Sequence, residues 1–511
     1  MGVVTMRRRP SVAVVEEAPL PRKLLMGLLF MALVFGYLII SETELPSQFL
    51  LFGAGLAFLL LFMVGMRRTD IPLYVLVAYL PFSKMLAGDF SGFMTAFNLT
   101  NLLLVLVVMS WAANPGREGR LKLEPHALHA PIFLMVLWAI ISFGYHEGRL
   151  GIEYLGSMSG VFKRWLDPIL LYFLFFSLVK DRQRWKTIVV LIMIGVTIAA
   201  LMAVVDYMGM KESTSLEKSR IGGIAGQPNI LGAFFVYYMF LFAGFWLQRI
   251  RQWRAWGYLI PFLLCFRGIM VTFSRGAYLA FAQGVMGLAF FKSKLLFALA
   301  VLAVGVAALN PWLLPPGIRY RLESTFRNRS GSIADVYTDM PDLQEELARS
   351  ATVRLIVWRG GLDMIKEDPA FGVGLGRFPI NIKHFTHEYG LYKYVDAHNT
   401  YLITAAEMGV PALVFLIFTF LAIFRITAVV YRHHPDPFIQ ATALGFLGGL
   451  SGLLMANMFG SRMNTTEVSG YFWILAALMA RAHRWVREAQ GTRRRGRGVV
   501  RSVPYVTGVE R

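Results

Sequence analysis

The chain has 511 residues, of which 56% are hydrophobic and only 16% are charged, and its mean hydropathy is +0.55. Soluble domains carry roughly 25% charged residues, so this composition excludes an ordinary soluble protein. Apolar runs recur at close to the roughly 20 residues that cross a bilayer. Runs such as 102–113 do not alternate as the strands of a membrane barrel would. The sequence therefore predicts an all-α, polytopic helical membrane protein.

The apolar runs predict about 12–14 transmembrane helices along the chain. The first run follows the basic start "MRRRP", as in a signal peptide, but it is long and no small-residue cleavage site follows it. We therefore expect it to remain as the first span. The expected spans are 24–40, 49–66, 71–86, 98–113, 131–145, 165–180, 186–208, 229–247, 255–273, 275–291, 295–312, 399–430, 437–459 and 467–484.

Basic residues orient these spans relative to the membrane. With a cytoplasmic N-terminus, every expected inner loop contains Lys or Arg, whereas the first outer loop, "SETELPSQ", contains neither. An even number of spans returns the basic tail 485–511 to the same side. The net charge of +20 is explained by these loops, by both termini and by anionic lipid, so it does not predict nucleic-acid binding.

The spans and loops divide the chain into five expected parts. These are a basic cytoplasmic N-terminus (1–23), N-terminal transmembrane helices (24–312), a large periplasmic loop (313–398), C-terminal transmembrane helices (399–484) and a basic cytoplasmic tail (485–511). The loop 313–398 is too long for a turn, and long ordered loops are usually functional.

The large loop contains a predicted helix over 352–368. Its apolar residues recur roughly at helical spacing, and the helix should stop at Asp368-Pro369. These apolar residues are Val353, Ile356, Val357, Leu362 and Ile365. The next stretch, "FGVGLGRFP" (371–379), lacks the Lys-Ser/Thr and the preceding strand of a nucleotide loop, so we expect a flexible turn laid against the membrane.

Several cations are expected on the outer face, where the positive-inside bias disfavours them. They are Lys163, Arg164, Arg220, Arg275, Arg354 and Arg359. Several lie beside residues that interrupt helices, as in "GGIAGQPN" (222–229), where Asn229 is placed to cap the next helix. Irregular backbone at membrane depth must be buried or must line a cavity. Because Arg matches phosphate oxygens with its planar fork, this group predicts a site for an anionic lipid headgroup, and a pyrophosphate would fit.

Four stretches resemble segments of the O-antigen ligase and polymerase superfamily, bacterial membrane glycosyltransferases with a large periplasmic loop. They are "SRIGGIAGQPNILGAF" (219–234), "TFSRGAYLA" (272–280), "RLIVWRGGLDMIKEDPAFGVGLGRF" (354–378) and "HNTYLITAAEMGVPALVFL" (398–416). The resemblance covers roughly 185–425 and is strongest in the last two stretches. Residues 1–180 match no motif of the family.

The resemblance implies a reaction in cell-surface polysaccharide and lipopolysaccharide biosynthesis. A glycan would move from undecaprenyl pyrophosphate to a hydroxyl of a glycan, lipid or protein acceptor, without metal or other cofactor. The active site would face the periplasm from the bacterial inner (cytoplasmic) membrane. Carried over by position, Arg220, Arg275 and Arg354 would hold the pyrophosphate and His398 would lie at the reacting centre. Asn229 and Asn399, within the same stretches, are expected substrate contacts. Helix capping at the start of the apolar run also accounts for Asn399.

The residue types support this chemistry without the resemblance. An acceptor hydroxyl needs a base near neutral pH, and the ordinary pKa of histidine suits that role. Asp396 could orient His398 or could be only a helix N-cap. Glu407 lies about two and a half helical turns from His398, on the opposite face, so we expect it to be structural and directed toward neighbouring spans. A capping or interfacial role for His398 is the alternative to catalysis.

Other polar residues leave alternatives open. The order in "HFTHE", with His384 and His387, differs from H-E-x-x-H, so exposed loop histidines or acceptor contacts are favoured over a metal site that includes His398. The single Cys265 excludes an internal disulfide and a Cys-ligated zinc site. The roles of Arg267 and Asp206 are not assigned.

Two activities share these motifs and the sequence does not separate them. A ligase moves finished glycan to an acceptor, whereas a polymerase joins repeat units on the carrier, and a protein-directed transferase is a third variant. A transporter would place ionisable groups deep in several spans and would show paired broken helices in two halves. Here the ionisable groups cluster at the outer ends, which favours a transferase.

Overall fold

The computed structural model describes residues 56, 58–86, 99–114, 124–210, 220–313, 319, 343–389, 391, 395–463 and 465–500. The chain divides into two compact units, Met1–Leu60 and Leu61–Arg511, and nearly all the described residues belong to the second. The expected span 24–40, the first part of 49–66, most of 314–342 and the end of the basic tail lie outside the described residues.

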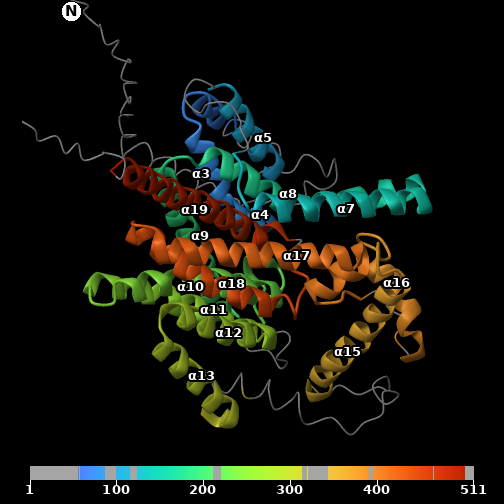
Figure 1. Cartoon of the computed structure of the whole chain (residues 1–511). Helices are drawn as coiled ribbons and strands as arrows, with labels where there is room; N and C mark the ends of the chain where they lie inside the picture. The colour runs from blue at the N-terminus through green and yellow to red at the C-terminus, as the bar shows by residue number, and fades with distance from the viewer. Residues whose placement is uncertain are drawn as a thin grey trace, which may run out of the picture. The chain divides into compact units, whose positions relative to one another are not determined.

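The described part of the chain is helical, with no strand among its residues, which confirms the all-α class (Figure 1). Six described helical segments are long and apolar enough to cross a membrane, which are α7, α9, α10, η4 with α11, α17 and α18. The helices are α3 Asp70–Tyr79, η1 Leu80–Phe82, α4 Ser83–Leu86, α5 Leu99–Ala112, α7 His129–Leu150, α8 Ile152–Leu178, α9 Arg182–Gly209, η3 Gly223–Ala225, α10 Pro228–Gln248, η4 Trp253–Tyr258, α11 Leu259–Thr272, α12 Arg275–Lys292, α13 Lys294–Leu309, η5 Pro311–Leu313, α15 Leu343–Glu367, α16 Phe378–Thr386, η7 His387–Tyr389, α17 Thr400–His433, α18 Pro437–Ala456 and α19 Thr466–Val500.

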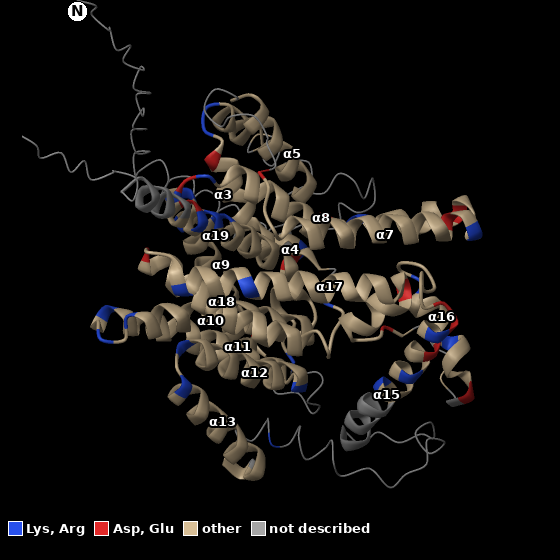
Figure 2. Ribbon diagram, viewed as in Figure 1, with Lys and Arg blue, Asp and Glu red and all other residues tan. Residues whose placement is uncertain are grey.

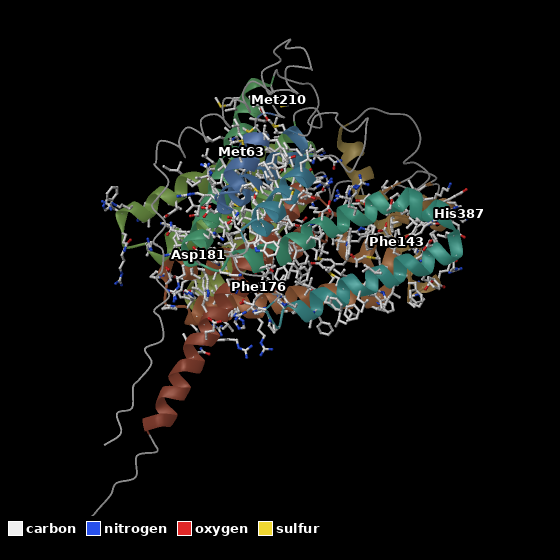
Figure 3. The ribbon with its side chains drawn as sticks, turned by 90° about the horizontal axis from the view of Figure 1, so that it is seen from above. Met63, Phe143, Phe176, Asp181, Met210 and His387 are labelled. Atoms are coloured by element: carbon white, nitrogen blue, oxygen red, sulfur yellow. The ribbon has the colours of Figure 1, made fainter. Side chains whose placement is uncertain are left out.

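Two helices extend well beyond the ranges expected from the sequence. Helix α8 begins at Ile152 rather than at 165, and α15 begins at Leu343 rather than at 352. The expected ranges followed apolar runs, but backbone hydrogen bonds continue through polar turns that an apolar run excludes. Helices α7 and α8 meet at Gly151, whose φ of 81° makes the tight turn between them. Figure 3 shows Phe143 on α7 and Phe176 on α8 toward opposite ends of this pair.

Helices α10 and α18 form the most buried pair of candidate spans in the described chain. Their backbones approach closely because small residues line the contact. A Cβ added to Gly449 would lie 2.1 Å from the carbonyl oxygen of Tyr237, and one added to Gly445 would lie 2.5 Å from that of Phe240. In a membrane, where lipid is as apolar as leucine, such close packing drives helix association.

Charged residues lie mostly at the helix ends, while the middles of the helices are apolar (Figure 2). We call the end that carries residues 396–400 and 457–465 the site end. The far ends of α17 and α18, joined by residues 434–436, form the opposite end. Helix α19 starts at the site end and carries Arg481, about 22 Å further along its axis, toward the opposite end.

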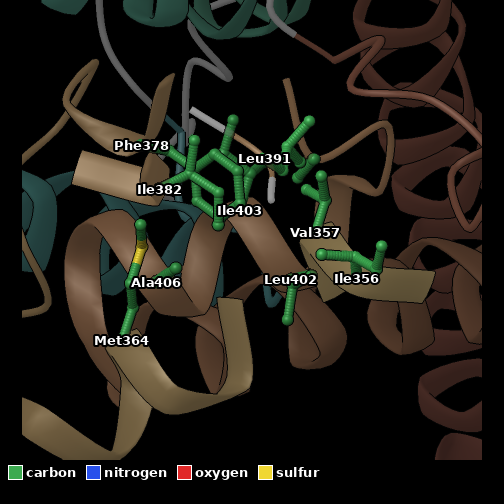
Figure 4. Packing of buried hydrophobic residues seen from close by; sticks show 10 residues of the cluster. Ile356, Val357, Met364, Phe378, Ile382, Leu391, Leu402, Ile403 and Ala406 are labelled. Carbon is green, nitrogen blue, oxygen red and sulfur yellow. The ribbon is translucent and has the colours of Figure 1, made fainter. Parts of the chain in front are cut away.

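Helix α15 packs on α16 and on the first turns of α17 through one apolar cluster (Figure 4). Of the apolar residues that predicted this helix, Ile356 and Val357 are buried in the cluster, and Val353 and Ile365 are partly buried. Leu362 is 53% exposed. The cluster fixes α15 against the segment that carries His398.

The glycine stretch 371–377 is a docked loop and not the flexible turn expected from the sequence. Its Val373 N–H donates to the carbonyl of Ala406 (2.8 Å), at the point where α17 is kinked. The kink is at Gly409, whose φ is 83° and where an added Cβ would lie 1.8 Å from the carbonyl oxygen of Ala370. Phe371 stacks on Trp138 of α7, with ring centroids 5.5 Å apart. Helices α7 and α17 therefore hold the loop on both sides.

Candidate active site

His398 lies in a short segment that leads into α17. The side-chain oxygen of Asn399 accepts hydrogen bonds from the backbone N–H groups of Tyr401 (3.0 Å) and Leu402 (3.1 Å), so Asn399 is the N-cap. The predicted capping by Asn399 is confirmed. Its side-chain oxygen is committed to this cap, and a substrate contact by Asn399 stays a prediction.

Asp396 does not cap α17 but binds His398. The Asp396 Oδ2 atom lies 3.2 Å from the backbone nitrogen of His398 and 3.2 Å from its Nδ1. Burial would raise the pKa of Asp396, but the hydrogen bonds and charge of His398 hold it below its usual value. When Nδ1 donates to the carboxylate, Nε2 carries the lone pair and can take a proton.

The backbone of His398 is held in an unusual conformation. Its φ of 46° lies in the left-handed region, which costs a residue with a Cβ about 1–2 kcal/mol. The neighbours enforce it, because Trp358 Nε1 donates to the carbonyl of Ala397 (2.9 Å) and Thr400 N–H donates to that of Asn457 (2.8 Å). Such enforced strain is common at functional sites.

Arg220 joins the start of α10 to the end of α11. Its Nε donates to the carbonyl of Thr272 (3.0 Å) and its Nη2 donates to Asn229 Oδ1 (2.8 Å). The prediction that Asn229 caps α10 was wrong, because the helix begins one residue earlier at Pro228 with Gln227 as N-cap. Proline suits the first helical position, and the Asn229 side chain binds the arginine.

Arg354 and Arg275 come to this region from two further helices. Half-buried Arg354, on α15, has a lowered pKa because of burial and then because of the charge of Arg220, so the two guanidinium groups lie near each other. Arg275 is the first residue of α12, and the next residue, Gly276, packs on Phe459, 2.7 Å from an added Cβ. The three predicted arginines thus belong to segments that converge at the site end.

The other predicted cations do not join this group. Lys163 Nζ pairs with Asp167 (2.5 Å) and donates to Asn101 (3.0 Å), while Arg164 and Arg359 are exposed. A cation with a carboxylate one helical turn away is already neutralised.

The sequence missed Arg462, in the loop between α18 and α19. Arg462 is only 4% exposed, and its pKa falls to about 10 because of burial, opposed by Tyr237 and reinforced by Arg354. Thr400 Oγ1 donates to the carbonyl of Gly460 (2.8 Å), which holds this loop beside the start of α17. The sequence contained a signal that could have identified Arg462, because an arginine on an expected outer loop opposes the positive-inside bias, as Arg220 does.

Glu407 and the remaining histidines have local partners. Glu407 is buried and accepts a hydrogen bond from the backbone N–H of Phe378 (3.0 Å), so its partner is the large loop and not a neighbouring span. His387 Nδ1 lies 2.7 Å from the carbonyl oxygen of His384. Among the described residues, no group of three or more His, Cys, Asp or Glu side chains could hold a metal ion.

Arg267 on α11 and Asp206 on α9 lie on the exposed sides of their helices. The Arg267 guanidinium lies 5.1 Å from the ring centre of Tyr207, which is a cation–π contact. Asp206, the neighbour of Tyr207 on α9, is exposed. Arg267 therefore has an aromatic partner that the sequence did not predict.

Comparison with known proteins supports the same part of the chain. Residues 260–417 match the family model described as O-antigen ligase, which covers under a third of the chain. The matched range contains Arg275, Arg354 and His398 and excludes Arg220 and Arg462. No curated protein matches the sequence. The matched domain makes the chain similar to the membrane enzymes of the O-antigen ligase and polymerase superfamily, which act in polysaccharide biosynthesis.

Proposed function

We propose that the chain is a metal-independent glycosyltransferase that moves a glycan from undecaprenyl pyrophosphate to an acceptor hydroxyl. The site end would face the periplasm from the bacterial inner membrane, and the acceptor would be a glycan, lipid or protein. The main support for this proposal is the Asp396–His398 pair, in which Oδ2 of Asp396 lies 3.2 Å from Nδ1 of His398. The segments that carry this pair meet those of Arg220 and Arg354.

In this reaction the donor is already activated, so the protein must hold it and stabilise the leaving group. His398 Nε2 takes the proton of the acceptor hydroxyl while that oxygen attacks the anomeric carbon. The bond from this carbon to the phosphate oxygen breaks, and the pyrophosphate leaves on its carrier with the electron pair. Arginines placed near the pyrophosphate stabilise the charge that develops there. Asp396 keeps the imidazole oriented and stabilises its protonated form.

Gene deletion followed by glycan analysis on gels and after extraction of the lipid carrier tests this proposal. We expect long chains stranded on the carrier, which is the result for a ligase. A single repeat on an otherwise normal acceptor would make the chain a polymerase of the same superfamily. Unchanged glycans in every fraction would exclude both activities.

A further inference from the structure

The loop between α18 and α19 contains two buried donors without acceptors. Asn457 Nδ2 and Arg462 Nε are buried and have no hydrogen-bond partner among the described residues. Asn457 is fully buried and Arg462 is 4% exposed. Each unsatisfied buried polar group costs about 1–3 kcal/mol, so two in one short loop require a reason. Both atoms can only donate, which means that the missing partner carries acceptor oxygens.

Other polar atoms of Asn457 and Arg462 have hydrogen-bond partners, so local packing holds both residues in place. Asn457 Oδ1 accepts from Tyr237 OH (2.8 Å), and the Asn457 carbonyl accepts from Thr400 N–H. Arg462 Nη2 donates to the carbonyl of Phe459 (3.1 Å), and the Arg462 backbone N–H reaches Thr400 Oγ1 (3.3 Å). The loop is held firmly while two donors remain without acceptors.

The charge around Arg462 indicates that the missing acceptor is an anion. The positive charge of Arg354 lowers the pKa of Arg462, and that of Arg220 lowers the pKa of Arg354. The carboxylate near them, Asp396, is hydrogen-bonded to His398. Water could satisfy an amide N–H but would leave Asp396 as the nearby negative charge that raises the pKa of Arg462, facing several arginines.

We propose that Asn457 and Arg462 also belong to the donor site, where they donate hydrogen bonds to oxygen atoms of the donor's pyrophosphate. The inference rests on the proposed function, because it takes the phosphoanhydride of that donor as the ligand. It adds two residues that lie outside the range of the family match, on the loop that follows α18. The same chemistry would suit a lipid headgroup phosphate, and the experiment below separates the two sources.

The test is calorimetric titration of inorganic pyrophosphate into the full chain, held in nanodiscs of zwitterionic lipid. Arg462→Gln removes the charge but keeps a donor, and we expect at least about tenfold weaker binding, the effect of one charge-assisted contact. Asn457→Asp keeps the acceptor for Tyr237 and turns the unsatisfied donor into an acceptor, so binding should be lost. Lys366→Ala removes one charge from a side chain that is 76% exposed, on α15, and should bind as the wild type does.

Each other outcome has a defined meaning. Wild-type affinity in both Arg462→Gln and Asn457→Asp would overturn this inference and leave the proposed function standing. No binding by the wild-type chain would overturn both. Loss of pyrophosphate binding in nanodiscs that contain anionic lipid would assign the site to headgroups. If Arg462→Gln does not fold, Asn457→Asp decides the question, because its new carboxylate can pair with Arg462 and support the loop.

Discussion

Two buried arginines, Arg462 at the site end and Arg481 toward the opposite end, are equally hidden but differ in their surroundings. Each is 4% exposed and leaves Nε without a hydrogen-bond partner among the described residues. Arg481, however, forms an ion pair with Glu124, donates to the carbonyl of Phe176 and lies 4.3 Å from the centre of the Phe176 ring. For Arg462 the nearby carboxylate is bound to a histidine instead.

At the opposite end, the buried positive charge of Arg481 is balanced by a carboxylate. Glu124 pairs with Arg484 as well as Arg481; burial would raise its pKa, but the two arginines hold it below its usual value. His126 Nε2 lies 3.0 Å from His483 Nδ1, and burial lowers the pKa of His126 to about 3, so it stays neutral. A buried charge with a dedicated counter-charge therefore serves the fold, whereas one without it indicates a ligand.

The largest expected effect is on the transfer rate, which should depend on the histidine at the site end and not on the histidine at the opposite end. His398→Ala should reduce transfer by about 10²–10⁴-fold, because it removes the proposed base. The matched change His126→Ala should leave turnover per folded molecule unchanged. Transfer rates of purified chains, corrected for the folded fraction, test this. Transfer by His398→Ala near the wild-type rate would show that His398 is not the base.

The next effect is on the free energy of unfolding, which should fall when Arg481 is replaced but not when Arg462 is replaced. Arg481→Ala leaves Glu124 without its buried partner, and breaking a buried pair costs about 3–5 kcal/mol. Because the Glu124 side chain is 30% exposed, we expect a loss of about 2–3 kcal/mol. Arg462→Gln should be neutral or stabilising in the absence of ligand. Unfolding in detergent measures both, and equal losses would remove the distinction.

The smallest effect is the pH dependence that Asp396 contributes. Because the pKa of Asp396 is lower in the folded chain than its usual value near about 4, its ionised form stabilises the fold above that pH. This contribution is lost as the pH falls through the lowered pKa. Since the Asp396 side chain is 37% exposed, we expect less than about 1 kcal/mol. Thermal unfolding of Asp396→Asn across this pH range should lack that component, and a profile equal to that of the wild type would contradict the assignment.

Local sequence signals were sufficient where the deciding contacts are local. The apolar runs determined the all-α membrane class, and helical spacing located the C-terminal part of α15. The cap at Asn399 depends on N–H groups two and three residues away, so it too followed from the sequence. Residue types and their neighbours also singled out Arg220, Arg354 and His398 for the site.

Only the tertiary structure decided which of these side chains meet. In the folded chain Asn229 accepts a hydrogen bond from Arg220 instead of capping a helix, and Glu407 accepts one from the backbone of Phe378. Leu362 lies on the exposed side of α15. The tertiary structure also brought Arg462 close enough to Arg354, more than 100 residues away in the chain, for the charge of Arg354 to lower the pKa of Arg462. Partners of this kind depend on how helices pack through close contacts such as that between Gly449 and Tyr237, and no short stretch of sequence encodes that arrangement.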